Sequence, residues 1–459
     1  MRRGRLIPLA SCCAVQRWRH ARWRRTSTKW PDELYDQASL AIGIASLQLL
    51  SAQERWIHRR VETIDLLRRE VVRRRVAVEF TLPLELHDEL SLMKGGPWCV
   101  PLAVLRKGRL RNFTITESGL PLGVLGAAQN GTVAKELLTA AAALATPRTN
   151  LPSPAFEAAL GDVANCEATT ASSRIDVVAR LALDDADAAL ALNDARFEYF
   201  LLTLADNYLL IAVLNDPTGR RIVEFAYDDD VRLGFRHLKL RRRVAERLGW
   251  VPVLIDIDVP GATETPSYHA EIVVPEDLRV GAFIFDTDSG ALLSTTIERS
   301  VDRAALHIAD VDPATVPVAL VSIVPERSGT VTLALGVASV TTTLLLVGGI
   351  ARDLEGPTTG TSATVLLAGS AVFAGLVARS DEHRLVRQAL AGVRATLTLV
   401  ALAALTAASA IGLGASEGTR QAIWTFSGCA AALATLSLII AFARAAPASA
   451  SDDTSDCDG

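Results

Sequence analysis

The apolar residues of the last third of the chain form four long runs that alternate with short polar loops. Each run is close to the roughly 20 residues that a helix needs to cross the hydrocarbon core of a bilayer. None of the runs contains Asp, Glu, Lys, Arg or His, and small residues, which let helix backbones approach closely, are frequent in all four. The pattern predicts a four-helix transmembrane bundle within an anchor at 327–446, with spans at Thr330 to Ile350, Ser362 to Ala378, Ala395 to Leu413 and Gln421 to Ala443.

The basic residues of the short loops predict how this anchor is oriented, because loops rich in Arg and Lys stay in the cytoplasm. The loop between the second and third spans contains Arg379, Arg384, Arg387 and Arg394, whereas each of the other two loops has one arginine. We therefore expect a multi-pass protein of a bacterial plasma membrane. Its N-terminal head and its C-terminus, an acidic and disordered tail at 447–459, would both be cytoplasmic.

The residues before the anchor predict an α+β head. Pro31 opens a stretch in which apolar residues recur every three or four positions, which predicts a long amphipathic helix over 31–75. At Val76 the period changes to two, which predicts a strand up to Pro83. The region 76–206 is predicted to be mixed α/β. It would have strands at Val100 to Leu105 and Arg111 to Thr116, and helices at Asn130 to Ala145 (capped by Thr132), Phe156 to Ala164, Ser173 to Leu183 and Asp194 to Leu204.

From Asn207 the pattern becomes β-rich. Two apolar runs, Tyr208 to Leu214 and Arg221 to Tyr227, flank the turn sequence Asn215 to Gly219 and predict a hairpin. Short strands at this spacing predict a β-sandwich-like domain over 207–326. After a helical link at Leu238 to Leu248, its further strands are expected at Val251 to Val259, Tyr268 to Val274, Ala282 to Asp286, Ala304 to Ala309 and Val316 to Val324.

The first 30 residues form a basic segment in which Trp and Arg alternate and no acidic residue occurs. Such a segment suits an anionic membrane surface or a nucleic-acid backbone, and it is also compatible with a start that has no role. A segment that the anchor holds near the membrane meets lipid more readily than nucleic acid. Each basic residue near an anionic leaflet contributes about 1 kcal/mol to membrane binding. We expect contact with anionic lipid and no nucleic-acid partner.

Composition narrows the setting. Only five of the 47 basic residues are lysine, a bias typical of a high-GC bacterial genome, and the net charge of -4 favours no particular partner. The six cysteines are scattered without the paired spacing of a zinc or redox site, and in the cytoplasm we expect them to be reduced.

Three stretches carry a family resemblance: VPLAVLRKGRLRNFTITESGLPL, LLIAVLNDPTGRRIVEFAYDDD and SYHAEIVVPEDLRVGAFIFD. They resemble a family of actinobacterial membrane-anchored proteins to which no activity is assigned. The resemblance runs from about Val76 through the spans. It implies an actinobacterial origin and a head-plus-anchor arrangement, and it implies no functional residue.

Acidic residues offer two candidate cation sites. Asp256 and Asp258 lie on one face of a predicted strand and, with Asp228 to Asp230, could bind a hard cation. These aspartates alternate with apolar residues, and a strand with one solvent-exposed face explains this alternation without a bound cation. We favour this explanation. The segment Asp286 to Gly290 begins like a calcium loop, but its glycine comes one position early and the closing acid is missing, so we interpret it as a turn.

Other candidate residues have equally plain explanations. His269 lies in a predicted strand, and Glu85, His87 and Glu89 alternate near a turn, but no catalytic or metal motif contains any of them. The glycines have neither dinucleotide-fold nor phosphate-loop spacing. These glycines are Gly119, Gly123, Gly126 and Gly131. The sequence therefore predicts no catalytic, cofactor-binding or metal-binding residue.

These patterns favour a membrane-anchored interaction or scaffolding module that binds an unknown protein partner or a second copy of itself. One alternative is an enzyme whose site is assembled from residues distant in sequence. The other is a four-helix channel with a polar lumen formed by Thr341, Thr342, Thr343, Thr425 and Ser427.

Overall fold

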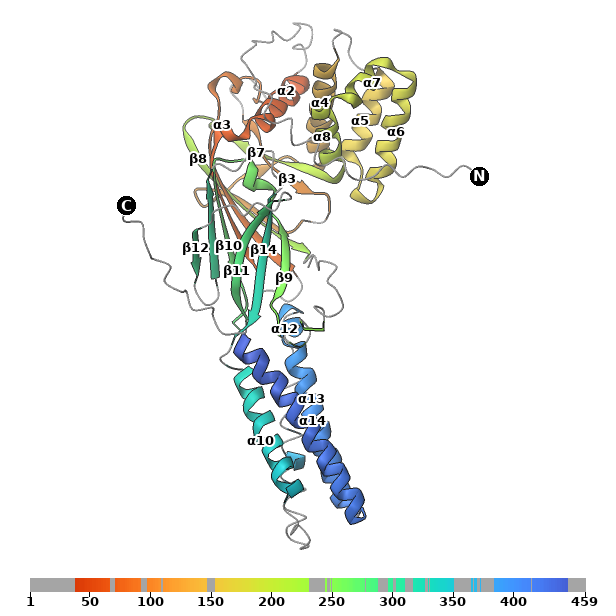
Figure 1. Ribbon diagram of the computed structural model, residues 1–459. Coiled ribbons are helices and arrows are strands. Elements are labelled where there is room, and N and C mark those ends of the chain that lie inside the picture. Colours follow the sequence, from red (N-terminus) through yellow and green to blue (C-terminus); the bar gives the residue numbers. More distant parts are fainter. Residues whose placement is uncertain are drawn as a thin grey trace, which may run out of the picture.

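The computed structural model shows a mixed α+β head above a stalk of helices (Figure 1). The head consists of three sheets with a group of helices at one side. The structure describes residues 38–66, 71–91, 97–108, 110–146, 153–230, 244–245, 248, 250–276, 278–287, 296–299, 303–309, 317–326, 329, 331–350, 365, 367–369, 372, 384–413 and 415–444. The basic segment 1–30, the tail 447–459 and most of the predicted link Leu238 to Leu248 lie outside these residues.

The helical part of the head is built around a core of Phe156, Phe197 and their apolar neighbours. Side-chain caps define several helix starts, because an oxygen there accepts the backbone N–H groups of the first turn. Ser153 caps α5, Asp185 caps α7 and Asp194 caps α8. The helices are α2 (Ala38–Ser51), α3 (Gln53–Trp56), α4 (Ala127–Ala145), α5 (Pro154–Asn165), α6 (Ala171–Asp184), α7 (Ala186–Asn193) and α8 (Ala195–Asp206).

These bounds confirm the four helices predicted between 130 and 204. The predicted cap of the first one is wrong. The helix α4 begins at Ala127, and Thr132 lies inside it, where its hydroxyl donates to the carbonyl of Ala128.

The largest sheet draws strands from the whole head. Its neighbouring strands are antiparallel except β1 and β10, which run parallel. Its strand order is β12 (Thr296–Arg299), β13 (Arg303–Ala309), β10 (Ser267–Val273), β1 (Ile57–Asp65), β2 (Val71–Thr81), β8 (Arg220–Asp230), β4 (Arg111–Glu117) and β5 (Leu120–Pro121).

Two smaller sheets complete the head. One has the order β11 (Leu278–Thr287), β14 (Pro317–Pro325) and β9 (Val253–Asp258), and its buried side chains share one core with those of β10 and β13. The other has the order β3 (Trp98–Arg106), β7 (Asn207–Leu214) and β6 (Gly123–Val124).

The long amphipathic helix predicted over 31–75 is wrong beyond residue 56. Residues 57–65 form β1 and residues 71–81 form β2, and these two strands pair with each other. Ile57, Val61 and Ile64 are β-branched, and β-branched side chains favour strands. Their spacings of three and four residues resemble the apolar stripe of an amphipathic helix. In such a helix Arg60 and Glu62 would face solvent, but both are buried on the inner face of the sheet.

The predicted hairpin at Asn215 to Gly219 is also wrong, although both of its strands exist. The first, β7, pairs with β3 and β6, whereas the second, β8, pairs with β2 and β4 in another sheet. The local turn chemistry is as expected: Asp216 accepts hydrogen bonds from Thr218, and Gly219 has a φ of 77°. Turn residues therefore specified a tight bend but not the pairing of the strands beside it.

The strands predicted between Val251 and Val324 are confirmed as β9, β10, β11, β13 and β14. A β-sandwich made of residues 207–326 is not confirmed, because the large sheet also contains β1, β2, β4 and β5 from the preceding region. Strand spacing along the chain indicates that a sheet exists but not which partner each strand takes.

The stalk consists of α10 (Thr332–Ile350), α13 (Ala391–Gly412) and α14 (Glu417–Arg444), joined to the head through the short α12 (Arg384–Ala389). Two segments, Ala391–Gly412 and Glu417–Ala443, are long and apolar enough to cross a membrane. The apolar stretch of α10, Thr332–Gly348, is shorter. The described residues therefore show two such helices and not the four predicted spans. Most of the predicted span Ser362 to Ala378 lies outside the described residues.

Small and hydroxylated side chains hold the stalk helices together. The hydroxyls of Thr342 in α10 and Thr435 in α14 lie 2.8 Å apart and share a hydrogen bond. Gly348 packs so closely against the indole of Trp424 that a Cβ at this position would overlap the ring. Such contacts allow close helix packing within a lipid environment.

Candidate functional site

Charged side chains are buried on the inner face of the large sheet. Glu62 on β1 is 2% exposed, and its carboxylate accepts hydrogen bonds from Arg74 at 2.8 Å and from the hydroxyl of Tyr268 at 2.9 Å. Arg60, two positions before Glu62, forms an ion pair with Glu264 at 3.1 Å. Strands β1, β2 and β10, together with Glu264 just before β10, therefore bring two arginines, two glutamates and a tyrosine into one network, which we call the buried charge network.

The surroundings of Arg60, Arg74 and Tyr268 in this network raise the pKa values of all three. Burial opposes the charge on Arg60, but Glu264 and Glu62 outweigh it, so the pKa of Arg60 is raised. Burial, reinforced by Glu62, raises the pKa of Tyr268 well above its ordinary value. At neutral pH the arginines therefore stay charged and Tyr268 stays a hydrogen-bond donor. The arrangement suits a fixed structural core better than proton transfer, which needs a group that titrates near the working pH.

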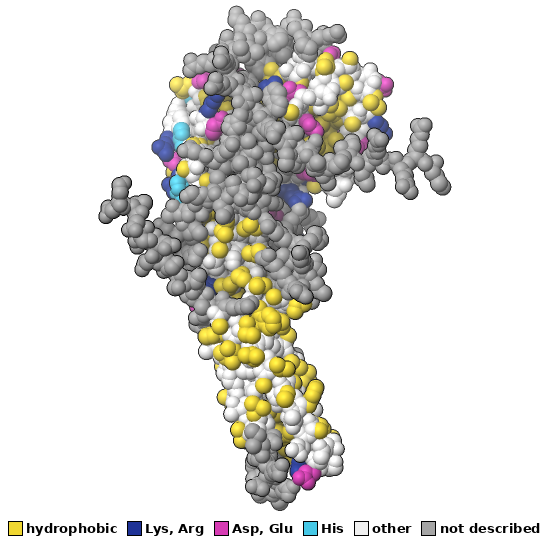
Figure 2. All heavy atoms as spheres, in the orientation of Figure 1, with side chains coloured by type: hydrophobic (Ala, Val, Ile, Leu, Met, Phe, Trp, Pro, Cys, Tyr) yellow, Lys and Arg dark blue, Asp and Glu magenta, His cyan; other side chains and the backbone are white. Residues whose placement is uncertain are grey.

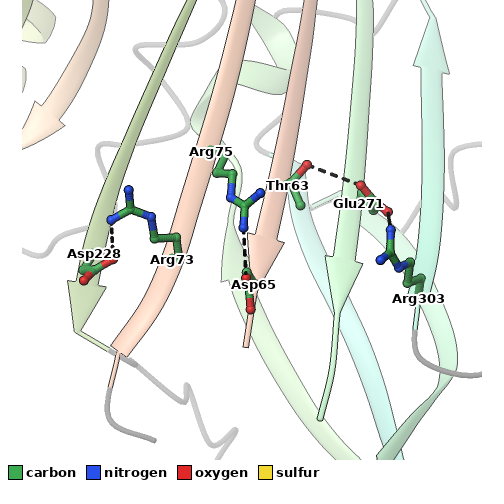
Figure 3. Close-up of polar contacts among 7 residues, drawn as sticks. All are labelled: Thr63, Asp65, Arg73, Arg75, Asp228, Glu271 and Arg303. Carbon is green, nitrogen blue, oxygen red and sulfur yellow. Dashed lines mark hydrogen bonds and ion pairs between the residues drawn. The ribbon is translucent and has the colours of Figure 1, made fainter. Parts of the chain in front are cut away.

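The opposite face of the same sheet has a second set of polar contacts (Figure 3). Arg73 pairs with Asp228 at 2.9 Å and Arg75 with Asp65 at 3.4 Å, so neighbouring strands are linked by opposite charges. The third group in Figure 3 joins β1, β10 and β13: Glu271 accepts from Thr63 and pairs with Arg303, both at 3.4 Å. The side chains of Arg75 and Arg303 are 63% and 59% exposed, whereas those of their partners Asp65 and Glu271 are 13% and 34% exposed, so the charges that this face presents most to solvent are guanidinium groups.

His269, a candidate from the sequence, lies on β10 directly opposite His307 on β13. The two ring centroids are 4.1 Å apart, and the hydroxyl of Ser267 lies 3.4 Å and 3.3 Å from their respective Nε2 atoms. Burial, together with the positive charge of Arg59 and the proximity of His307, lowers the pKa of His269 to about 4. The nearby Glu271 is engaged by Thr63 and Arg303, so this group does not form a Ser-His-acid arrangement for nucleophilic catalysis.

The lowered pKa of His269 predicts a pH effect on stability. An unfolded histidine takes up a proton near pH 6.5, whereas folded His269 takes it up only near pH 4. The folded state therefore loses stability as pH falls through this window. Because solvent screens the partly exposed ring, we expect a modest effect: the melting temperature of His269→Gln should decrease less than that of the wild type between pH 7 and pH 5. Equal decreases would contradict the prediction, and His58→Gln is the matched control.

The other sequence candidates do not converge on a site. Asp256 and Asp258 lie on β9, whereas Asp228 to Asp230 end β8 in the large sheet. Asp286 is near the end of β11, and residues 288–290 lie outside the described residues. Within the residues that the structure describes, no group of three His, Cys, Asp or Glu side chains could hold a metal ion.

The remaining candidates have local structural roles. Glu85 lies in the short helix Leu84–Leu86, and the carbonyl of His87 accepts the indole N–H of Trp98 at 2.9 Å. Gly119 takes a φ of 79° in the turn between β4 and β5. The other glycines lie on different elements, Gly123 on β6, Gly126 just before α4 and Gly131 within α4.

The hydroxyls proposed to line a channel have different surroundings. Thr341 and Ser427 are buried and Thr342 bonds to Thr435, whereas Thr343 and Thr425 are exposed and bond to carbonyls of their own helices. They do not form one polar surface.

Sequence reasoning missed a cavity of about 820 Å³ between the β3-β7-β6 sheet and the ends of α4 and α5. Lys107 and Cys166 lie in its wall, with Nζ and Sγ 3.8 Å apart. They are 59 residues apart in sequence, and no motif contains either of them. Spacing along the chain gave no signal for this site.

Comparison of the chain with protein families, with curated proteins and with solved structures finds no match. The actinobacterial resemblance stays a prediction.

Proposed function

We propose that this chain is a membrane-anchored interaction module whose head and C-terminus lie in the cytoplasm. The observation that carries the proposal is the apolar surface of the stalk. Large apolar side chains on α10, α13 and α14 are exposed, including Val340 at 60%, Leu402 at 56% and Phe426 at 77%. Apolar side chains gather along the stalk in Figure 2. Exposing this apolar surface to water is unfavourable, whereas contact with the hydrocarbon tails of lipids is not.

The junction between head and stalk supports the same placement. The indole N–H of Trp250 donates to the hydroxyl of Ser437 near the end of α14, at 3.1 Å. Tryptophan is enriched at the boundary between lipid and water, where its ring is buried and its N–H is bonded. Basic residues of the predicted loop, among them Arg384 and Arg387 in α12, lie at this same end of the stalk. Cytoplasmic placement follows from the excess of arginine there.

An interaction role fits the head better than catalysis does. Glu62, Arg60 and Tyr268 of the buried charge network are buried inside the head, and the side chains of the charged sheet face are paired with one another. The exposed guanidinium groups of Arg75 and Arg303 on this face suit a protein partner of complementary charge, because such pairs provide specificity and rapid association. The basic segment 1–30 would add contact with anionic lipid.

A proximity-labelling enzyme fused after Gly459 tests the proposal in membranes of the native host. We expect the chain to stay in the membrane fraction after an alkaline wash and to label cytoplasmic proteins. A subset should be labelled more strongly by the full chain than by a control that contains residues 327–459 alone. Extraction by alkali would refute the anchor, labelling of exported proteins would refute the orientation, and identical labelling by the control would refute the interaction role.

A further inference from the structure

The cavity beside Lys107 has the size and the walls of a small-molecule site. Its volume of about 820 Å³ lies within the range of roughly 300–1,000 Å³ that is typical of ligand pockets. Its wall is formed by Lys107, Gly108 and Leu110 after β3, by Phe113 of β4, by Val124 of β6 and the start of α4, by the end of α5 and the residues after it, and by the start of β7. Apolar side chains, among them Leu110, Phe113 and Leu125, form much of the wall.

Lys107 gives this mostly apolar cavity a positive charge. Its ammonium group donates to the carbonyl of Val163 at 2.8 Å and lies 3.8 Å from the sulfur of Cys166. Burial lowers the pKa of Lys107, and Cys166 and Asp206 oppose this effect only in part. Within the described chain, no carboxylate forms an ion pair with Lys107. The charge is therefore partly desolvated, and the attraction of Asp206 compensates for this only in part.

One contact of the Lys107 ammonium, its bond to the carbonyl of Val163, has a structural explanation. The carbonyl of Val163 belongs to the last turn of α5, where carbonyls have no helical partner and a cation is stabilising. This bond and the weaker one to the sulfur of Cys166 occupy two of the three N–H groups of the ammonium. The third N–H group is available to a ligand, and a bound anion would compensate for the hydration that the ammonium loses on burial.

Two further groups in the wall favour an anion. The first residues of α4, Ala127 and Ala128, line the cavity, and Gly126 before them has no side chain to cap their N–H groups. These amides form the positive end of a 19-residue helix. Tyr208 also lines the cavity, and burial raises the pKa of its hydroxyl to about 12, so that it remains a donor. The one acidic residue of the lining, Glu167, is exposed, and water screens its charge.

We propose that this cavity binds a small amphipathic carboxylate, with the carboxylate paired to Lys107 and an aromatic or short acyl body against Leu110, Phe113 and Tyr208. Because the wall has one lysine and extensive apolar surface, it suits a single negative charge better than a phosphate ester with two. This ligand site is separate from the charged sheet face and from the membrane stalk, and it goes beyond the proposed interaction role.

Binding of 2-naphthoate, measured by its fluorescence with the full chain in detergent, tests the inference. The uncharged 2-naphthamide is the matched ligand, and 2-naphthyl phosphate is the doubly charged one. We expect the wild type to bind 2-naphthoate at least about tenfold more tightly than either, because a hydrogen bond to a charged partner contributes about 1.5–3 kcal/mol. Lys107→Met should remove the preference for the acid over the amide, and Lys107→Arg should retain it.

The control variant is Lys135→Met, which removes a lysine that already faces Glu136 and Glu157 at 3.7 Å and 3.9 Å. It should bind 2-naphthoate as the wild type does. Equal affinity of the wild type for acid and amide, no binding of either, or unchanged preference in Lys107→Met would overturn the proposal. Tighter binding of the phosphate ester would overturn the choice of a carboxylate.

A second measurement does not depend on how well Lys107→Met folds. The thiol of Cys166 is free, half-buried and in the cavity wall. In the wild type, bound 2-naphthoate should slow the reaction of Cys166 with N-ethylmaleimide, measured by peptide mass spectrometry, whereas 2-naphthamide at the same concentration should not. Equal reaction rates with and without 2-naphthoate at saturating concentration would place the ligand outside the cavity and refute the site.

Discussion

Replacing Glu62 with alanine should destabilise the head by about 3–5 kcal/mol, because it removes one partner of a buried ion pair and leaves the other charge uncompensated. Glu62 accepts hydrogen bonds from Arg74 and Tyr268, and it also offsets the burial of Arg60. The variant would keep two buried guanidinium groups with one fewer acid between them. Urea unfolding of the full chain in detergent, followed by circular dichroism, should show a large decrease in the midpoint.

The matched control is Glu224→Ala, which removes a glutamate from β8 of the same sheet at an exposed position. Surface substitutions of this kind usually change stability by less than about 0.5 kcal/mol. The double variant Glu62→Leu with Arg74→Leu should recover part of the loss, since it removes both charges together. If Glu62→Ala unfolds at the same urea concentration as Glu224→Ala, the network does not contribute as described.

Replacing Trp56 with alanine should also cost about 3–5 kcal/mol, the range measured when large aromatic side chains are removed from cores. Trp56 is 1% exposed, its ring lies edge-on to Phe80 with centroids 5.5 Å apart, and its N–H donates to the carbonyl of Leu49 at 2.9 Å. It therefore fastens the end of α2 to strand β2. The same unfolding experiment measures the effect.

Two variants separate the contributions of Trp56. Trp56→Phe keeps an aromatic ring but loses the hydrogen bond to Leu49, so we expect a smaller loss. Leu84→Ala shortens a side chain that is 77% exposed and should leave the midpoint nearly unchanged. A loss in Trp56→Ala no larger than in Leu84→Ala would contradict the packing described.

Local patterns predicted most elements of the head, and long-range pairing determined what they could not predict. The alternation after Val76 and four periodic segments between 130 and 204 specified their own conformation, as β2 and the helices α4, α5, α6 and α8 show, whereas α7 was not predicted. Residues 57–65 were predicted to be helical because Arg60 and Glu62 are charged and were interpreted as part of a solvent-exposed helix face. Their burial depends on Glu264 and Tyr268, which no local window contains.

The candidate sites show the same limit. The sequence singled out His269 as an isolated histidine but gave no sign of His307, which only strand pairing places beside it. Lys107 and Cys166 meet because a β-strand ends beside the last turn of a helix. Charge spacing is informative when a site lies on one element, and these sites lie between elements.

The parallel pairing of β1 with β10 has a consequence for synthesis. Glu62 and Tyr268 are 206 residues apart, so the centre of the sheet stays open until most of the head has left the ribosome. Loop closure over such a distance makes folding slow, and β1 meanwhile exposes the edge that later pairs with β10. The apolar helix α10 begins only 15 residues after β14 starts. In the proposed membrane protein, insertion of the stalk would therefore coincide closely with closure of the sheet.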